Sequence, residues 1–293
     1  MLSIDPAATP IGELHQYLVG AVAPRPIAFV STVDEEGNPN LAPYSFFNVF
    51  SSNPPTAVFS SNRRVSNNTT KDTLANVRAT GEAVINVVNY PMTRQMALAS
   101  AEYPTGVSEF EKAGFTSLPS EKVKAFRVGE SPVQFECKVK DIITLGDGGG
   151  AGHLVICDIV HLHIDENVLA ENGKIDPHKI DLVGRMGRAF YTRASGDAIF
   201  SVFQNVTKPG IGFDQLPAHI RSSRFLTGWQ LAEIAALETA PSDEVIDAAR
   251  LDPRLMNIMA GNAQEREAHL HRYAAELIDA GEAEKAYAVL GME

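Results

Sequence analysis

The chain has 293 residues, of which 44% are hydrophobic and 21% are charged, as is ordinary for a soluble globular protein. Its formal net charge of −11 argues against a nucleic-acid partner, which would require a basic face. The first five residues lack the features of a signal peptide, and no apolar run approaches the ~20 residues of a membrane span. We therefore expect a cytoplasmic protein without a membrane contact, built as one large domain or as one domain with an extension.

The segment that follows Arg25 predicts an antiparallel arrangement of strands. Its β-rich runs lie at 26–33, 40–49 and 56–61. The connections between these runs are short and rich in turn residues, so they suit hairpins and leave no room for crossover helices. This excludes a doubly wound nucleotide-binding fold. Residues 11–22, ahead of the first run, are interpreted as a leading segment or a strand.

Hydroxyl groups and cations gather where the third run ends and a helix begins. They are Ser60, Ser61, Arg63, Arg64, Thr69, Thr70, Lys71 and Thr73. A helix N-terminus offers free N–H groups and the positive end of the helix dipole, so this cluster suits a phosphate. An alternative stays open, in which Thr69 or Thr70 is only a helix cap and the cations only keep a loop solvated.

The middle of the chain alternates short helices with strands. Helices are expected at 71–80, at 90–98 and at 108–114, and strands at 83–88, 133–145 and 154–164. The glycine-rich segment 146–152 joins two strands. A phosphate-binding glycine loop would need a helix after it, so a flexible hairpin loop is the favoured interpretation.

Two pairs of side chains raise the question of metal or redox chemistry. His161 and His163 share one face of a strand and would supply half of a metal site, but no third ligand stands at a suitable spacing, so we predict no metal. Paired histidines at the surface or at a barrel rim are the alternative. Cys137 and Cys157 are expected to be buried free thiols, because no C-x-x-C spacing supports another role.

The composition changes near Thr207, where Pro209–Gly212 indicates a linker. Helices are expected at 229–237, after Ser242, from Pro253, at 262–281 and at 282–290. In the fourth of these, an apolar stripe is formed by Leu270, Tyr273, Ala274 and Leu277. We predict a domain at 1–206 and a helical extension at 207–293, which packs on the first domain or a partner subunit, or binds another protein.

Three blocks of sequence together resemble a known family. Arg25–Thr32, Asn40–Asn48 and Lys71–Asn76 are similar, in order, to the flavin reductase-like FMN-binding split-barrel proteins, which include flavoredoxins and NAD(P)H:flavin oxidoreductases. The resemblance covers about the first two-thirds of the chain. It implies a mainly β fold with some helix, an antiparallel split β-barrel whose sheet we expect to be closed, followed by the helical extension.

The resemblance also implies a set of cofactor-binding residues. Those expected near the flavin ring and its ribityl chain are Arg25, Ser31, Thr32, Ser45, Phe46 and Asn48. Those expected at the phosphate are Ser60, Ser61, Lys71 and Thr73. For Arg25 an exposed turn position is the alternative, and for the serines of the strands ordinary strand polarity. No catalytic side chain is assigned.

Two further segments have a counterpart in the family. Tyr103–Gly114, with its Ser-Glu-Phe sequence, corresponds to a mobile cover beside the flavin, although helix caps and a phenylalanine anchor explain the same residues. Tyr191 and Arg193 correspond to a block near the flavin or the dimer partner, or else they form a pair on an edge strand.

By this resemblance the chain is expected to bind FMN noncovalently, to use NADH or NADPH as hydride donor, and to form a homodimer. Its electrons would pass to free flavin, ferric ion, a monooxygenase partner or another acceptor. The flavin itself would carry out the redox step, which agrees with the lack of an obvious acid–base pair. The alternatives are an FMN-dependent enzyme acting on a small organic substrate, a flavin carrier, and a protein whose helical tail docks a partner.

Overall fold

The computed structural model describes residues 1–104, 106–202 and 207–292. The chain divides into two compact units, Met1–Phe200 and Ser201–Glu293, each with a hydrophobic core of its own. The predicted domain boundary between residues 206 and 207 adjoins 203–206, which lie outside the described residues, so that boundary stays a prediction.

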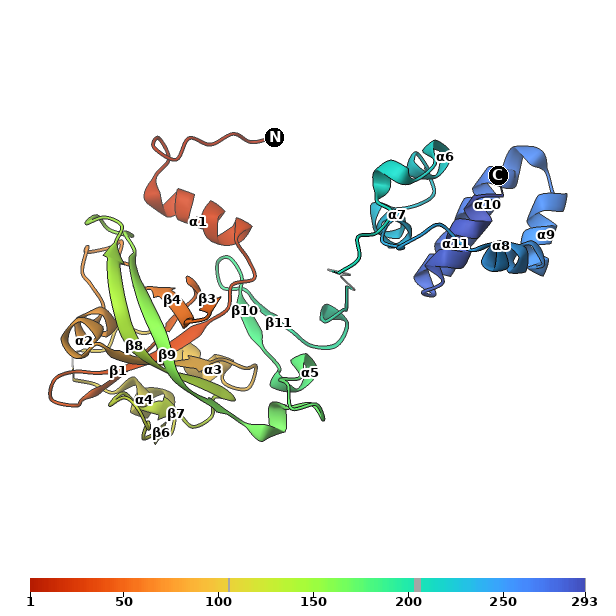
Figure 1. Cartoon of the computed structure of the whole chain (residues 1–293). Coiled ribbons are helices and arrows are strands. Elements are labelled where there is room, and N and C mark those ends of the chain that lie inside the picture. The colour runs from red at the N-terminus through yellow and green to blue at the C-terminus, as the bar shows by residue number, and fades with distance from the viewer. Residues whose placement is uncertain (105, 203–206, 293) are drawn as a thin grey trace. The chain divides into compact units, whose positions relative to one another are not determined.

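The first unit combines a large sheet with short helices (Figure 1). Its helices are α1 (Ile11–Ala21), α2 (Asp72–Thr80), α3 (Thr93–Leu98), α4 (Glu109–Ala113) and α5 (Pro177–Ile180), with 3₁₀ turns η1 (Glu166–Val168) and η2 (Gly196–Ala198). Its strands are β1 (Ala28–Val33), β2 (Pro39–Tyr44), β3 (Phe47–Ser52), β4 (Pro55–Ser60), β5 (Glu82–Val87), β6 (Ser117–Leu118), β7 (Arg127–Val128), β8 (Val133–Thr144), β9 (His153–Ile164), β10 (Val183–Arg185) and β11 (Tyr191–Arg193).

Within the described residues seven strands form one antiparallel sheet in the order β2-β1-β5-β8-β9-β4-β3. The two edge strands, β2 and β3, follow each other in the chain and are joined by Ser45 and Phe46 alone. This short joint brings the edges near one another, but they do not pair, so the barrel is split. The predicted split barrel is therefore confirmed. The expectation of a closed sheet was wrong, and the single run predicted at 40–49 is broken at this joint.

The longest pairing in the sheet is the hairpin of β8 and β9, whose register runs from Val133↔Ile164 to Thr144↔His153. The predicted hairpin connection through the glycine-rich segment is confirmed. Gly149 lies against the preceding loop, where an added Cβ would come within 3.1 Å of the Val65 carbonyl oxygen. A side chain at this position would push the two loops apart.

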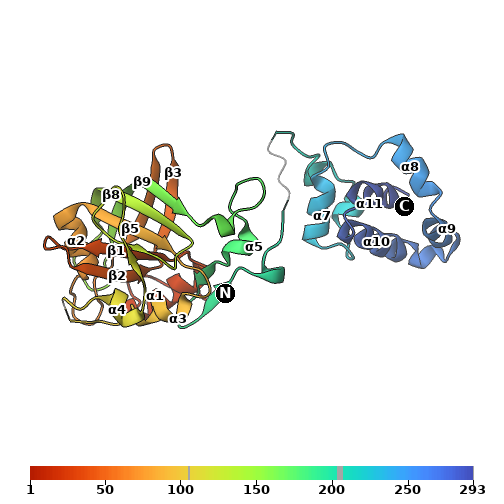
Figure 2. The ribbon, with the colours of Figure 1, turned by 90° about the horizontal axis from the view of Figure 1, so that it is seen from below.

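The main core fills the inside of the curled sheet and includes one face of α2. Its buried members are Ala28, Val30, Tyr44, Ala57, Phe59, Leu74, Val77, Ala83, Ile85, Cys137, Val155 and Cys157. Both cysteines are buried and free, as the sequence predicts. A second cluster, which includes Phe29, Leu41 and Phe110, lies where α3 and α4 cover the outside of β1 and β2 (Figure 2). The helices thus gather along the β2 edge, where the candidate site lies.

Residues 11–21 form α1, so the interpretation of this segment as a strand was wrong. Val19 is the helix's buried residue, and its apolar and polar positions give no clear strand alternation. Arg25 fixes the end of the helix, because its Nη1 donates to the carbonyl oxygens of Val19 at 2.5 Å and Val22 at 2.7 Å. A buried guanidinium thereby satisfies carbonyls that a helix C-terminus leaves without partners.

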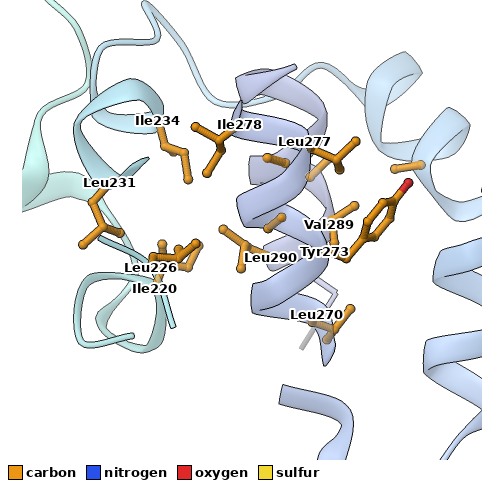
Figure 3. Close-up of a cluster of buried hydrophobic side chains, with 14 of the residues drawn as sticks. Ile220, Leu226, Leu231, Ile234, Leu270, Tyr273, Leu277, Ile278, Val289 and Leu290 are labelled. Atoms are coloured by element: carbon orange, nitrogen blue, oxygen red, sulfur yellow. The ribbon is translucent and has the colours of Figure 1, made fainter. Parts of the chain in front are cut away.

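The second unit is helical, as predicted. Its helices are α6 (Ala218–Arg221), α7 (Gly228–Ala235), α8 (Asp243–Arg250), α9 (Pro253–Ala260), α10 (Ala263–Asp279) and α11 (Ala283–Leu290), with the 3₁₀ turn η3 (Phe213–Gln215). Ser242, Asp252 and Asn262 each accept a backbone N–H as helix caps. The stripe predicted on α10 is buried and packs with α7 and α11 (Figure 3).

In the described ranges, no helix has both the length and the apolar character that crossing a membrane requires.

Candidate functional site

The N-terminus of α2 lies at the end of the loop that follows β4. Lys71 is its N-cap residue, with an extended backbone, and within the described residues no side chain caps the first turn. The alternative in which Thr69 or Thr70 serves as the cap was therefore wrong. Gly81 ends the helix in the left-handed conformation, as predicted. The positive end of the helix dipole is consequently left open to another acceptor.

Two cations stand beside this helix end. The Lys71 ammonium lies 4.9 Å from the centre of the Tyr44 ring, and among the described residues no carboxylate comes within 4.0 Å of it. Burial lowers the pKa of Lys71, and the field of Arg64 lowers it further, while Glu102 opposes both. Arg64 donates to the Thr70 carbonyl at 2.6 Å and to Glu102 at 2.8 Å. Lys71 therefore carries a partly desolvated charge that an anion would stabilise.

Three adjoining cavities run along β2, and we call them together the β2 groove. Their volumes are about 90, 130 and 280 Å³. The first and second share Pro43 and Ser100, and the second and third share Ser45 and Arg185. The groove therefore runs from the cations at α2 to the joint between β2 and β3. Its polar lining includes Asn40, Ser45, Arg64, Lys71, Asp72, Thr73, Ser100, Glu102, Tyr103, Glu109, Arg185 and Tyr191.

Glu109 connects the segment predicted as a cover to the groove. Its Oε2 accepts the backbone N–H of Leu41 at 3.0 Å, on the edge strand β2. Burial raises the pKa of Glu109, although this hydrogen bond opposes the rise. Ser108 is the N-cap residue of α4 and Gly114 its left-handed C-cap, as the sequence predicts. Tyr103 and Glu109 thus line the groove, whereas mobility of this segment stays a prediction.

Two buried hydroxyls at the same end lack hydrogen-bond partners. They are Tyr44 Oη and Ser61 Oγ, and neither makes a hydrogen bond within the part of the chain that the structure describes. Burial raises the pKa of Tyr44 to about 12, although the Thr73 and Ser61 hydroxyls that face it favour the ionised form. Tyr44, whose ring lies 4.9 Å from the Lys71 ammonium, thus has hydroxyl neighbours but no hydrogen bond of ordinary geometry, and a nearby polar ligand could supply one.

Not all of the predicted site residues reach the groove. Ser31 is fully buried and donates to the carbonyl oxygen of Phe126, so it faces the protein interior. Thr32 is also buried and accepts from Asn40 and Asn76 at 3.3 and 3.0 Å. Asn40 donates in turn to Thr73 at 2.8 Å. Thr32 therefore does not line the groove but holds the side chain of Asn40, which does, and Thr73 lines the groove itself.

Near the joint between β2 and β3, Ser45 lines two of the cavities, and Arg25 and Phe46 line the third. Arg25 Nε lies 3.4 Å from Ser45 Oγ, and burial lowers the pKa of Arg25, as does the neighbouring Arg185. Because the Arg25 guanidinium also holds the end of α1, it supports the groove wall instead of standing free in a turn. The turn alternative for this residue is thus excluded.

The remaining predicted residues lie around β3 and β4. Asn48 is exposed on β3, and its side chain accepts the N–H of Val49 at 2.8 Å. Ser60 donates to Asn62 at 2.7 Å. These two side chains, like Ser61, do not line the groove. Their assignment to the cofactor stays a prediction.

Tyr191 and Arg193 both lie on β11, in the hairpin of β10 and β11. Tyr191 lines the groove, with Arg185 stacked 4.6 Å from its ring centre. Arg193 points elsewhere, because it pairs with Asp181 at 2.7 Å and stacks on Tyr90 at 3.9 Å. Sequence reasoning missed Asn40, Ser100 and Arg185 as groove residues. Asn40 lies in β2, Ser100 in the turn after α3 and Arg185 at the end of β10, and only the fold brings these three elements together.

A family model described as "Flavin reductase like domain" matches residues 20–179, which is more than half of the chain. The chain belongs to this family. The match includes the part of the groove formed by β2, α2 and α4, and it ends before Arg185. A relative in Aquifex aeolicus is 37% identical over 189 residues, which are 64% of this chain and 94% of that protein.

Solved structures of the family have the same fold as the first unit. Nitrilotriacetate monooxygenase component B from Bacillus cereus is 30% identical with a TM-score of 0.63, and the match covers 70% of this chain and 98% of that one. The 2-nitrobenzoate 2-nitroreductase NbaA of Pseudomonas fluorescens is 27% identical with a TM-score of 0.62, over 72% of this chain and all of that one. The chain is thus a split-barrel flavoprotein oxidoreductase by family.

Proposed function

We propose that the protein binds FMN noncovalently in the β2 groove and acts as an NADH- or NADPH-dependent reductase. Its electrons pass to free flavin, ferric ion, a monooxygenase partner or another acceptor. One observation carries the proposal: in a chain of the flavin reductase family, an uncapped helix N-terminus and the cation Lys71 meet at one end of a groove. A phosphate is the ligand group that this end suits best.

In this proposal, different residues of the β2 groove bind different parts of FMN. Lys71, the first N–H groups of α2 and Thr73 hold the phosphate, with the unpaired Ser61 and Tyr44 hydroxyls close by. β2 is an edge strand. Glu109 takes the N–H of Leu41, and Pro39 and Pro43 have none, so this edge would offer a planar ring mainly carbonyl oxygens. Ser45 and Tyr191 border the far end. The bound flavin would supply the redox chemistry, by accepting hydride from the nicotinamide and passing on electrons.

The test compares FMN with riboflavin, which has the same ring and no phosphate. Purified protein is titrated with each, and binding is followed by flavin fluorescence. We expect FMN to bind at least about 10-fold more tightly than riboflavin, since charge-assisted hydrogen bonds to the phosphate contribute roughly 1.5–3 kcal/mol each. Equal affinities would remove the phosphate assignment, and failure of both to bind a folded protein would remove the function.

A second candidate is an FMN-dependent enzyme that reduces a small organic substrate directly. It is favoured by the 27% identity with a protein named as a 2-nitrobenzoate 2-nitroreductase. The two candidates differ in their need for free flavin. NADH and NADPH oxidation is measured without oxygen, with and without excess flavin, and with a nitroaromatic acceptor. Turnover that requires excess flavin supports the reductase, whereas turnover with the nitroaromatic alone supports the second candidate. A flavin carrier would give neither.

We also propose a homodimer with the flavin near the subunit boundary. Phe46 and Tyr191 border the groove and are 38% and 37% exposed, so a second copy would cover apolar surface there. Light scattering on the purified protein gives the mass directly. An electron-accepting partner such as a monooxygenase, and a place in the cytoplasm, also stay proposals. The bacterial neighbour named as component B of a monooxygenase supports the first of these.

A further inference from the structure

Two histidines stand together on β9, away from the β2 groove. His161 and His163 lie two residues apart on the strand, and their ring centres are 4.7 Å apart. Opposite them on β8, Glu136 pairs with His161 and Cys137 with Ile159, so Val160 is an extra residue that bulges β9. Bulges redirect side chains and occur often beside functional sites. Here the bulge adjoins the two imidazoles.

A third potential ligand comes from the segment between β6 and β7. Glu121 places a carboxylate oxygen 3.5 Å from His161 Nε2. One ligand atom from each of Glu121, His161 and His163 lies within 4.8 Å of the other two. Glu121 stands 40 residues before His161, so no local spacing in the sequence joins them. The fold supplies the carboxylate that the sequence pattern lacked.

The buried carboxylate of Glu136 contacts both the backbone beside Glu121 and the side chain of His163. It is fully buried, and it accepts the backbone N–H groups of Glu121 and Lys122 at 2.8 and 2.6 Å. It also lies 2.6 Å from His163 Nε2. These three contacts give the buried carboxylate a partner on each side. One buried carboxylate therefore positions both the Glu121 backbone and the His163 ring.

A carboxylate on one nitrogen of a histidine, as Glu136 is on His163, is common around protein metal ions, where the other nitrogen is the ligand. With Nε2 at Glu136, His163 would offer Nδ1 to a metal. Zinc binds two histidines and one carboxylate at about 2.0–2.2 Å, which brings ligand atoms to roughly 3.3 Å from one another. Glu121 and His161 are 60% and 33% exposed in their side chains, so they can rotate inward by this small distance.

We propose that His161, His163 and Glu121 bind one divalent transition-metal ion, zinc first among them, with Glu136 as the positioning carboxylate. The site shares no residue with the β2 groove. Three protein ligands leave a coordination position for water. The bound ion would tie the segment before β7 to β9 and stabilise the sheet at that place.

The experiment uses the full chain without an affinity tag, freed of metal by a chelator. Zinc binding is measured by competition with a chromogenic chelator, and the cobalt complex is examined by visible absorption. Glu121→Gln removes the negative charge of a ligand carboxylate at an exposed position, and His161→Gln removes a ligand imidazole. His178→Gln is the matched control, because His178 is an exposed histidine at the start of α5, outside the cluster. Circular dichroism checks the fold of each variant.

We expect one zinc per chain in the wild type and in His178→Gln. His161→Gln and Glu121→Gln should each weaken zinc binding by about 10- to 100-fold, and the cobalt spectrum should lose its intensity. Zinc should also raise the melting temperature of the wild type and not that of these two variants. Wild-type affinity in folded Glu121→Gln and His161→Gln proteins would overturn the proposal. So would a wild type that binds no more zinc than His161→Gln, or an equal loss in His178→Gln.

Discussion

At the scale of single residues, Lys71 is the side chain whose removal tests the groove most directly. We expect Lys71→Ala to weaken FMN binding by about 10- to 100-fold, because a charge-assisted contact with the phosphate contributes roughly 1.5–3 kcal/mol. Riboflavin binding should hardly change, since riboflavin has no phosphate. Fluorescence titration measures both. Lys174→Ala, at an exposed lysine outside the groove, is the control. A parallel loss of riboflavin affinity would mean that the substitution disturbs the groove itself.

The lowered pKa of Lys71 predicts a pH dependence for the same binding. The ligand phosphate favours the protonated ammonium, so affinity for FMN should be constant near neutral pH and should fall as pH rises through the pKa of Lys71. Because this pKa lies below the ordinary lysine value, the fall begins at a lower pH than for an exposed lysine.

The matched variant for this measurement is Lys71→Arg, whose guanidinium stays charged throughout the range. Its FMN affinity should remain flat where the wild-type affinity falls. Titrations run above pH 7, where the phosphate is already doubly charged, and riboflavin corrects for ionisation of the ring. The same decline in Lys71→Arg as in the wild type would assign the pH dependence to another group.

Residues in the same predicted set differ in how well the sequence could place them. Lys71 and Thr73 stand at a helix start, where the sequence pattern indicates the exposed end. Ser31 and Thr32 stand in β1, which is buried along its whole length. A strand buried on both faces loses its alternation of polar and apolar residues, so the sequence cannot tell which face a serine occupies. Only the contacts with Phe126 and Asn40 decide this.

At the scale of elements, strong local signals were sufficient for most helices and strands. The β8–β9 hairpin follows from two long β-rich runs and a glycine-rich connection, and α2 from its glycine stop. The joint at Ser45 and Phe46 was missed, because the residues on both sides have the same β character. The break depends on β2 and β3 taking opposite edges of one sheet, which is a long-range property. The helix α1 likewise depends on Arg25 and Met186 for its docking.

The cap of α7 offers a prediction for the helical unit. Thr227 Oγ1 accepts the Gln230 N–H at 3.2 Å, and Gln230 Oε1 accepts the Thr227 N–H at 3.0 Å. Gln230 also donates to Asp279 at the end of α10 at 3.0 Å. We expect Thr227→Ala to lower the free energy of unfolding by about 1–2 kcal/mol, because this reciprocal cap is lost.

Trp229 makes this measurable, since it is the chain's single tryptophan and lies on α7. Urea unfolding followed by tryptophan fluorescence gives the free energy of unfolding of the wild type and of Thr227→Ala. Thr239→Ala, at an exposed threonine outside any helix, is the control and should leave the midpoint unchanged. If Thr227→Ala unfolds at the same urea concentration as the wild type, the cap contributes nothing to the stability of this unit.

At the scale of the whole molecule, the chain joins two units with separate cores. The residues that line the β2 groove lie in the first unit, between Ile27 and Tyr191 in its first two cavities. The family model and the solved neighbours also match this part of the chain. Two roles are open to the helical unit, namely a part in the proposed FMN site and a separate task such as docking a partner.

A chain that ends at residue 206 distinguishes these two roles. We expect it to keep its β-sheet and to bind FMN within about threefold of the full chain, since the first unit has its own core and carries the groove. Circular dichroism checks the sheet, and fluorescence titration gives the affinity. NADH- and NADPH-dependent flavin reduction is measured on both chains, and capture of an electron-accepting partner is compared between them. Loss of the partner with reductase activity kept would make the helical unit an interaction module. If the truncated chain folds but no longer binds FMN, the helical unit contributes to the cofactor site. If the truncated chain fails to fold, the helical unit is a structural part of the barrel.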